Sequence, residues 1–119
     1  MSQSDTTLNE LSVKLNDFAS EREWDQFHNP KNLAMALAAE VGELIEHFQW
    51  LTLEQADSLP LEARDEVALE AADVLLFLLR LCDKLEIDLG AATKRKLDIN
   101  ARKYPVERAR GRATKYDKL

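Results

Sequence analysis

The sequence predicts an all-α protein, a four-helix bundle-like domain that associates into an oligomer. The 119-residue chain contains only three glycines and three prolines. Its periodic stretches are rich in Ala, Leu, Glu, Lys and Arg, which are strong helix formers. One of these stretches is apolar around nearly its whole circumference, a pattern typical of a bundle centre or a subunit interface.

The first helix is expected over residues 6–21, as an amphipathic surface helix. Its apolar stripe consists of Leu8, Leu11, Leu15 and Phe18, which recur at helical spacing. The Asn29–Pro30 step then interrupts the helical pattern, because the residue before a proline disfavours helical geometry. Either Asn29 or Asn32 has a side chain suited to cap the helix that follows.

Three further helices follow in order. The second is expected over residues 31–51, and residues 52–60 are interpreted as a connection. Pro60 suits the first turn of the third helix, which should reach residue 84 or 86 and carries only two charged residues, Asp73 and Arg80, between positions 71 and 82. The fourth should span residues 89–103, with Asp88 as its N-cap and Pro105 just beyond its end. The remaining residues are expected to be irregular.

Length and composition predict a single domain over residues 1–119, with residues 105–119 as a basic tail. The single cysteine, Cys82, lies in an apolar helical run and is predicted to be a core residue, so no intrachain disulfide can form. The first ten residues lack the apolar core of a signal peptide, and no apolar run has membrane-spanning length. We therefore expect a cytoplasmic protein without a membrane partner.

Charge is distributed unevenly along the chain. Residues 1–90 hold 6 Lys and Arg against 19 Asp and Glu, whereas residues 91–119 hold 10 against 3. The basic tail is open to three interpretations: a solvated extension that balances charge, a nucleic-acid-binding arm, or a set of cations that grips a phosphate chain. The acidic body argues against nucleic acid, and the acid pairs described next favour the third interpretation.

Two pairs of carboxylates lie where a soluble helix would normally carry apolar side chains. Glu40 and Glu43 form one pair, and Glu70 and Asp73 form the other. Each pair is spaced i, i+3, which places two like charges on one helix face. The only basic partner at helical spacing is His47, four residues after Glu43. Because an unpaired buried carboxylate usually takes up a proton or binds a metal, the pattern suggests a cation held between two helices.

The ligand types narrow the choice of cation. A di-iron bundle requires Glu-x-x-His motifs, and neither His28 nor His47 has a glutamate three residues before it. Oxygen ligands alone favour Mg²⁺, or Mn²⁺, and Mg²⁺ commonly neutralises substrate phosphates. The structural alternative is that the acids pair across helices with cations of the chain. Those cations would be Arg64, Arg80, Lys84 and the basic tail.

Three ordered motifs resemble a known family. They are Glu40-Val-Gly-Glu43-Leu-Ile-Glu46-His-Phe-Gln-Trp50, Glu70-Ala-Ala-Asp73-Val-Leu-Leu, and Lys96-Leu-Asp98-Ile-Asn100-Ala-Arg-Lys-Tyr104-Pro105. They are similar to the all-α nucleoside triphosphate pyrophosphohydrolases related to MazG, and most similar to the dCTP pyrophosphatase branch. The resemblance implies Mg²⁺-dependent hydrolysis of dCTP or a modified dCTP to the monophosphate and pyrophosphate, which clears unwanted nucleotides from the pool.

The resemblance also implies roles for individual residues. The metal ligands would be Glu40, Glu43, Glu70 and Asp73. The nucleotide would be contacted by Lys96, Asn100 and Tyr104, and the base-binding region would comprise Trp24, His28 and Trp50. Phe77 departs from the family pattern, because the relatives carry tyrosine there, and the missing hydroxyl leaves the base preference open.

The residue types support these roles on physical grounds. Tryptophan faces are platforms for stacking a base, although each tryptophan could equally close the rim of the core and His28 could be a loop-capping residue. Lys96 and Asn100 share one helix face, being spaced i, i+4. Further phosphate contacts are expected from Lys31, Arg102, Arg112 and Lys115, unless these are simply solvated. Glu46, one turn after Glu43, is the favoured general base, with Glu66 as the competing candidate.

Other functional classes remain open at this point. One is a non-catalytic helical interaction protein whose apolar faces are oligomer interfaces, and another is a related pyrophosphohydrolase with a different nucleotide preference. In every case the apolar third helix predicts a symmetric assembly, either a homodimer or a homotetramer. The family implies the same association through helices.

Overall fold

The computed structural model describes residues 6–119, and every regular element in that part of the chain is a helix. This confirms the all-α class. The elements are α1 (Leu8–Glu21), η1 (Asp25–Phe27), α2 (Pro30–Glu46), α3 (Leu53–Asp57), α4 (Leu61–Lys84), α5 (Leu89–Lys103), α6 (Val106–Ala109) and η2 (Tyr116–Lys118).

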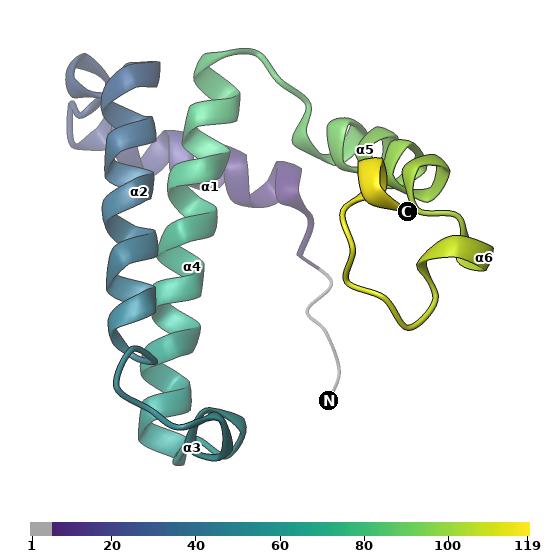
Figure 1. Ribbon diagram of the computed structural model, residues 1–119. Coiled ribbons are helices and arrows are strands. Elements are labelled where there is room, and N and C mark those ends of the chain that lie inside the picture. The colour runs from purple at the N-terminus through teal and green to yellow at the C-terminus, as the bar shows by residue number, and fades with distance from the viewer. Residues whose placement is uncertain (1–5) are drawn as a thin grey trace. The chain divides into compact units, whose positions relative to one another are not determined.

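The chain forms two compact units, one ending at Ile87 and the other beginning at Asp88. In the N-terminal unit α2 and α4 form an antiparallel pair, and α1 packs against α4 (Figure 1). The short helix α3 lies in the connection that joins the paired ends of α2 and α4 (Figure 1). The C-terminal unit contains α5, α6 and η2. The expectation of one domain over the whole chain stays a prediction.

Side-chain caps fix the starts of α1, α2 and α5. Thr7 Oγ1 accepts a hydrogen bond from the Glu10 amide at 3.1 Å, which begins α1. Asn29 Oδ1 accepts from the Asn32 amide at 2.9 Å, so Asn29 rather than Asn32 is the cap of α2. Asp88 accepts from the Ala91 amide at 3.0 Å, and α5 has the predicted bounds. Each cap satisfies an amide that the first helical turn leaves free.

Three sequence expectations need correction. α2 ends at Glu46, because the chain tightens into turns over residues 47–50 through bonds such as Phe48 N–H to the Ile45 carbonyl at 2.9 Å. The predicted connection contains α3, which is started by a capping box in which Thr52 and Gln55 exchange side-chain and backbone hydrogen bonds. Pro60 occupies the N-cap of α4 rather than its first turn.

The tail after α5 is also more regular than expected. Pro105 has a φ of −61° and precedes the single-turn helix α6. A 3₁₀ turn, η2, follows near the C-terminus. Proline favours such a start because its fixed φ suits helix entry and its missing N–H is not needed there.

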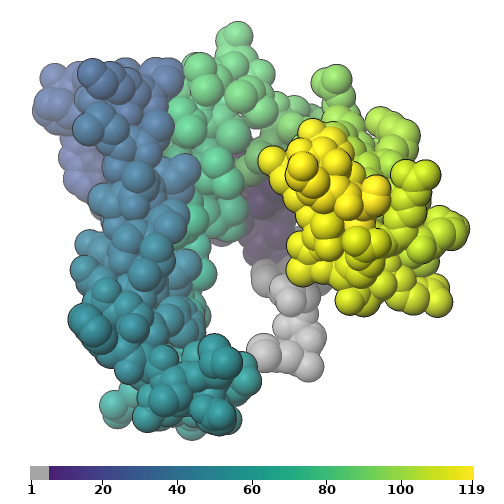
Figure 2. Space-filling view, viewed as in Figure 1, coloured from purple at the N-terminus to yellow at the C-terminus, as the bar shows by residue number. Residues whose placement is uncertain are grey.

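The core of the N-terminal unit is small. Among the described residues, the buried apolar side chains are Ala19, Leu33, Leu79 and Cys82. Cys82 is therefore a core residue, as predicted, and burial raises the pKa of its thiol. Large apolar side chains are exposed around the α3 end of the unit, including Trp50 at 87%, Leu53 at 84% and Leu61 at 81%. Figure 2 shows this end of the unit in teal.

No helix in the described range is both long enough and apolar enough to cross a membrane. The expectation that the N-terminus lacks a signal sequence falls partly on residues 1–5, outside the described residues.

Candidate metal and nucleotide site

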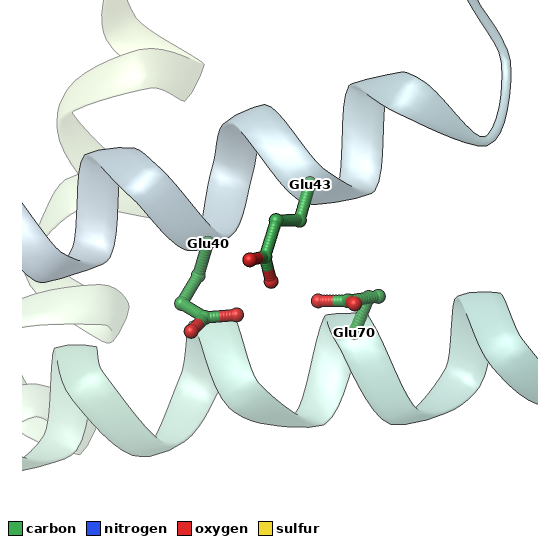
Figure 3. Close-up of side chains that lie close together, drawn as sticks. All are labelled: Glu40, Glu43 and Glu70. Atoms are coloured by element: carbon green, nitrogen blue, oxygen red, sulfur yellow. The ribbon is translucent and has the colours of Figure 1, made fainter.

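Three of the predicted metal ligands converge between α2 and α4. Glu40 and Glu43 lie on α2 and face Glu70 of α4 (Figure 3). One carboxylate oxygen from each of the three lies within 4.8 Å of the others. The i, i+3 spacing puts both α2 glutamates on the side that meets α4. We call Glu40, Glu43 and Glu70 the acidic cluster.

The cations of the N-terminal unit, such as Arg80 and Lys84, do not neutralise the acidic cluster. Oε2 of Glu40 and Oε2 of Glu70 are buried and accept no hydrogen bond from the described residues. Arg80 and Lys84 instead form ion pairs with Asp25. No ion pair within residues 6–87 involves a member of the cluster. Two buried oxygens without a partner are costly, and a bound cation would satisfy both.

The electrostatics of the acidic cluster appear in the pKa of Glu40, which is raised from its ordinary value of 4.5 to about 7. Burial is the largest cause. The hydrogen bond and charge of Glu43 follow, and then the charges of Asp73 and Glu70. Like charges close together disfavour a further ionisation, so a proton at Glu40 takes the place that a cation would fill.

Asp73 lies beside the acidic cluster but is not one of its three converging residues. Its charge contributes to the raised pKa of Glu40, and its side chain also lines the neighbouring pocket. Asp73 therefore connects the acidic cluster to that pocket.

The donor set fits a hard divalent cation. All of the converging atoms are carboxylate oxygens, which is the chemistry that Mg²⁺ and Mn²⁺ prefer. The buried, unpartnered oxygens of Glu40 and Glu70 point to the same conclusion.

The two candidate general bases lie in different surroundings. Glu46 is the last residue of α2 and is exposed. Glu66 is exposed on α4, and its Oε2 lies 3.9 Å from Nδ1 of His47. Helical spacing makes His47 a possible partner for Glu43, but in the structure His47 lies beside Glu66. Glu66 is therefore the more restrained of the two.

A pocket of about 220 Å³ lies next to Asp73, between α1, the loop before α2, and α4. It is lined by Leu15, Phe18, Ala19, Trp24, His28, Asp73, Leu76, Phe77 and Arg80. The four α4 residues follow the i, i+3, i+4, i+7 pattern of one helix face. Two of the three residues that the sequence assigned to base binding, Trp24 and His28, meet in this pocket.

A sharp turn after α1 brings Trp24 and His28 to the pocket. Glu23 adopts a left-handed backbone with φ of 56°, and the Trp24 amide bonds back to the Ala19 carbonyl at 2.9 Å. The Trp24 ring meets the edges of Phe18 and His28, with centroid separations of 5.6 and 6.2 Å. The loop is thus held by aromatic packing on α1.

Arg80 anchors the same loop from α4, a role that the sequence analysis did not assign to it. The side chain is only 4% exposed. Its Nε–H donates to Nδ1 of His28 at 3.1 Å, its Nη1–H donates to Asn16 Oδ1 at 2.6 Å, and its Nη2–H donates to Asp25. We call these residues the Arg80 network: Arg80, Asn16, Asp25 and His28. A lone arginine in the apolar run of residues 74–82 was the available signal.

The surroundings of two members of the Arg80 network shift their pKa values. The hydrogen bond from Lys84 to Asp25, at 3.1 Å, and then the bond from Arg80 lower the pKa of the Asp25 carboxyl. Burial, followed by the positive charge of Arg80, lowers the pKa of His28. Both effects favour the neutral form of His28.

The other predicted binding residues lie apart from this pocket or in the C-terminal unit. Lys31 is exposed at the start of α2, and Trp50 is exposed in the turn after it. Lys96 and Asn100 lie one turn apart on α5. Tyr104 follows α5, and its ring meets Tyr116 edge-on at 6.1 Å. Arg102, Arg112 and Lys115 are exposed within the C-terminal unit.

The sequence is similar to those of known proteins. Residues 35–119 match the MazG-like family. The chain is 42% identical over 118 residues to dCTP pyrophosphatase 1 of Bos taurus, covering 98% of this chain and 70% of the relative. It is also 42% identical over 116 residues to dCTP pyrophosphatase 1 of Homo sapiens, covering 95% and 68% of the two chains.

A solved structure shares the fold. A pyrophosphatase from Archaeoglobus fulgidus superposes with a TM-score of 0.74 at 40% identity, covering 88% of this chain and 98% of that one.

Proposed function

The chain belongs to the MazG-like family, and on that premise we propose that it is a Mg²⁺-dependent pyrophosphohydrolase that converts dCTP to dCMP and pyrophosphate. The observation that carries this function is the acidic cluster, whose buried oxygens lack partners, beside a pocket lined by Trp24 and Phe77. Modified forms of dCTP are included in the proposal, and the physiological task is to clear such nucleotides from the cytoplasmic pool.

The metal would be held by the acidic cluster together with Asp73. When bound, Mg²⁺ supplies polarisation of the phosphoryl oxygens and screening of the polyphosphate charge, and Mn²⁺ offers similar chemistry. The chain's own contribution is to hold the carboxylates of α2 and α4 opposite one another in an unneutralised arrangement. Replacing a proton on Glu40 by the cation would remove the repulsion that raises its pKa.

The base would occupy the pocket next to Asp73. Trp24 offers an aromatic face for stacking, and stacking gives affinity with little discrimination between bases. Discrimination must therefore come from polar side chains of the pocket, which include His28, Asp73 and Arg80. Phe77 lines the same pocket and brings no hydroxyl to it.

Hydrolysis requires a group that accepts a proton from the attacking water. We assign this role to Glu46, which is exposed and has no ion-pair partner within residues 6–87. Glu66 is the second candidate, and its proximity to His47 restrains it. The water would attack the α-phosphorus, break the bond to the β-phosphate oxygen and release pyrophosphate. Trp50 stays assigned to the base-binding region, and phosphate and sugar contacts are assigned to Lys31, Lys96, Asn100, Arg102, Tyr104 and Lys115.

We also propose a homodimer or a homotetramer as the working form. Exposed apolar side chains cluster around the α3 end, where Trp50, Leu53 and Leu61 are each more than four-fifths exposed. Such a surface is typical of an interface between subunits. Sedimentation velocity at micromolar concentration should show more than one chain per particle, and a fully active monomer would contradict the assignment.

The proposed function is tested by incubating a panel of nucleoside triphosphates with Mg²⁺ and measuring pyrophosphate and orthophosphate separately. We expect pyrophosphate without orthophosphate, fastest from dCTP or a modified dCTP, and no turnover when EDTA removes the metal. Orthophosphate release would mean cleavage at the terminal phosphate and would contradict the reaction. The absence of any turnover would favour a non-catalytic interaction protein.

A further inference from the structure

Arg80 is the only residue with a charged side chain that is classed as buried in the described part of the chain. Its guanidinium forms no hydrogen bond or ion pair with the acidic cluster or with Asp73. Its guanidinium binds the loop that carries Trp24 and His28. Every polar group of this arginine is a hydrogen-bond donor. The direction of each bond in the Arg80 network is therefore known without seeing a hydrogen atom.

The bond from Arg80 to His28 determines where the imidazole proton lies. Arg80 Nε–H donates to His28 Nδ1 at 3.1 Å, so Nδ1 must be the unprotonated, accepting nitrogen. In the neutral ring the single proton then lies on Nε2. No described residue forms a hydrogen bond to Nε2, so this N–H remains free for a ligand.

The other contacts of Arg80 fix the guanidinium itself. Its Nη1–H donates to Asn16 on α1 and also lies 3.7 Å from Asp83, and its Nη2–H donates to Asp25 in η1. The direction of Nε–H is therefore set from two segments distant in sequence, α1 and η1, and from Asp83 on α4 itself. A planar guanidinium held on several sides loses little freedom when it orients one more partner.

Resting on the proposed function, we propose that Arg80 is a positioning residue for base recognition, which holds His28 with Nε2–H as a donor toward the pocket. The ligand that this donor selects is a nucleobase that presents an acceptor there, either a carbonyl oxygen or an unprotonated ring nitrogen. Cytosine offers both kinds of acceptor, O2 and N3. Because His28 is lined up as a donor alone, an N–H group of a base in the same place would leave two donors facing each other.

The decisive variants separate the bond to His28 from general anchoring of the loop. Arg80→Lys keeps the positive charge beside Asp25 but removes the planar Nε–H that points at His28. Lys84→Met is the matched control, because Lys84 lies one turn further along α4 and also binds Asp25, at 3.1 Å, but does not touch His28. Each variant changes one of the two cations that pair with the Asp25 carboxylate.

We expect Arg80→Lys to raise the KM for dCTP and the Kd for dCMP about tenfold, with kcat changed by less than about threefold, because one oriented hydrogen bond is lost. The preference for dCTP over other nucleoside triphosphates should fall with it. Lys84→Met should leave all of these unchanged. Equal effects of the two variants, or an unchanged KM in Arg80→Lys, would overturn the proposal.

A second pair of variants tests the donor directly and covers the case in which Arg80→Lys does not fold. In His28→Gln the side-chain amide can place an N–H close to the position of Nε2, whereas in His28→Asn it reaches only the position of Nδ1. We expect the KM for dCTP to rise by less than about threefold in His28→Gln and about tenfold in His28→Asn. The reverse order, or equal values, would contradict a donor at Nε2.

Nitrogen NMR provides a readout that does not depend on turnover. At a pH well above the ordinary imidazole pKa, the two-bond proton–nitrogen correlations of His28 should show the proton on Nε2 and a hydrogen-bonded Nδ1. In Arg80→Lys the hydrogen-bond shift of Nδ1 should disappear. A proton on Nδ1 in the wild type would overturn the inference even if dCTP is hydrolysed. Failure of the wild type to release pyrophosphate would count against the proposed function alone. The NMR and dCMP-binding measurements would still test the role of Arg80 in positioning His28.

Discussion

Glu70 and Arg80 are both charged side chains of α4, but neighbouring residues pair with the charge of Arg80 and not with that of Glu70. Glu70 faces two further carboxylates, and its buried Oε2 has no hydrogen-bond partner among the described residues. Arg80 is more deeply buried, and it donates hydrogen bonds to three side chains and pairs with two carboxylates. One helix therefore carries an unsatisfied site and a satisfied one.

The difference indicates what each region is for. Polar groups that serve only the fold are paired when they are buried, because an unpaired buried group costs free energy. The Arg80 network obeys this rule and holds the loop between α1 and α2 in place. The acidic cluster breaks the rule, and such exceptions are expected where a protein binds a ligand. The proposed metal site is therefore marked by buried oxygens without partners, and the Arg80 network by buried donors that all have partners.

The largest expected effect comes from removing a charge from the acidic cluster. Glu70→Gln should lower pyrophosphate release about 1000-fold or more, equivalent to about 4 kcal/mol of transition-state stabilisation, because the cation would lose a ligand. Without metal, the free energy of unfolding should stay level or rise, since repulsion is relieved. Glu62→Gln, in the exposed first turn of α4, is the matched control. Near-normal turnover of Glu70→Gln at limiting Mg²⁺ would contradict the site.

The Arg80 network should respond with the opposite pattern. Arg80→Ala leaves Asp25 and His28 without their buried partner, and we expect the free energy of unfolding to fall by about 3 kcal/mol. Lys84→Ala should cost less than about 1 kcal/mol, because Lys84 is a more exposed member of the ion pair. Urea denaturation followed by circular dichroism measures both. If Arg80→Ala proves as stable as the wild type, the network is not a structural anchor.

A smaller effect is expected at the pocket that lies between these two regions. Trp24→Ala should raise KM about tenfold for every nucleotide that the enzyme accepts, because a stacked base contributes about 1–3 kcal/mol whatever its identity. Phe27→Ala is the matched aromatic control, since Phe27 is exposed in the same loop and does not line the pocket.

Asn100→Ala, on α5, should instead change the preference between bases or sugars. Equal losses for all nucleotides in Asn100→Ala would remove its recognition role.

The same contrast explains which features the sequence could predict. The acid pairs depend on i, i+3 spacing within single helices, so local periodicity was sufficient to pick out Glu40, Glu43 and Glu70. The bounds of α5 were also predictable, because Asp88 caps its start and Pro105 lies just after its end. Local signals of this kind do not depend on the rest of the fold.

The Arg80 network is made of contacts that no local pattern encodes. Its partners His28, Asp25 and Asn16 lie 52, 55 and 64 residues away in the sequence. A charged residue in an apolar run indicates that some partner exists, but the packing of α1 on α4 decides which one. The helix α3 was missed for a different reason: the Thr52–Gln55 capping box was present in the sequence, but the segment was interpreted as a connection.

The smallest expected effect concerns the pH dependence of stability without metal. The pKa of Glu40 is raised to about 7 from 4.5, so the folded protein binds a proton that the unfolded chain has already released between these values. The linked stabilisation is fully present below about pH 4.5 and is lost as the pH rises through 7. Thermal unfolding in EDTA should therefore show stability falling over this range, and falling less steeply in Glu40→Gln than in Glu62→Gln. Saturating Mg²⁺ should reverse the trend, because the cation competes with the proton for the same carboxylates. Identical pH profiles for the two variants would show that Glu40 does not carry the proton of the acidic cluster.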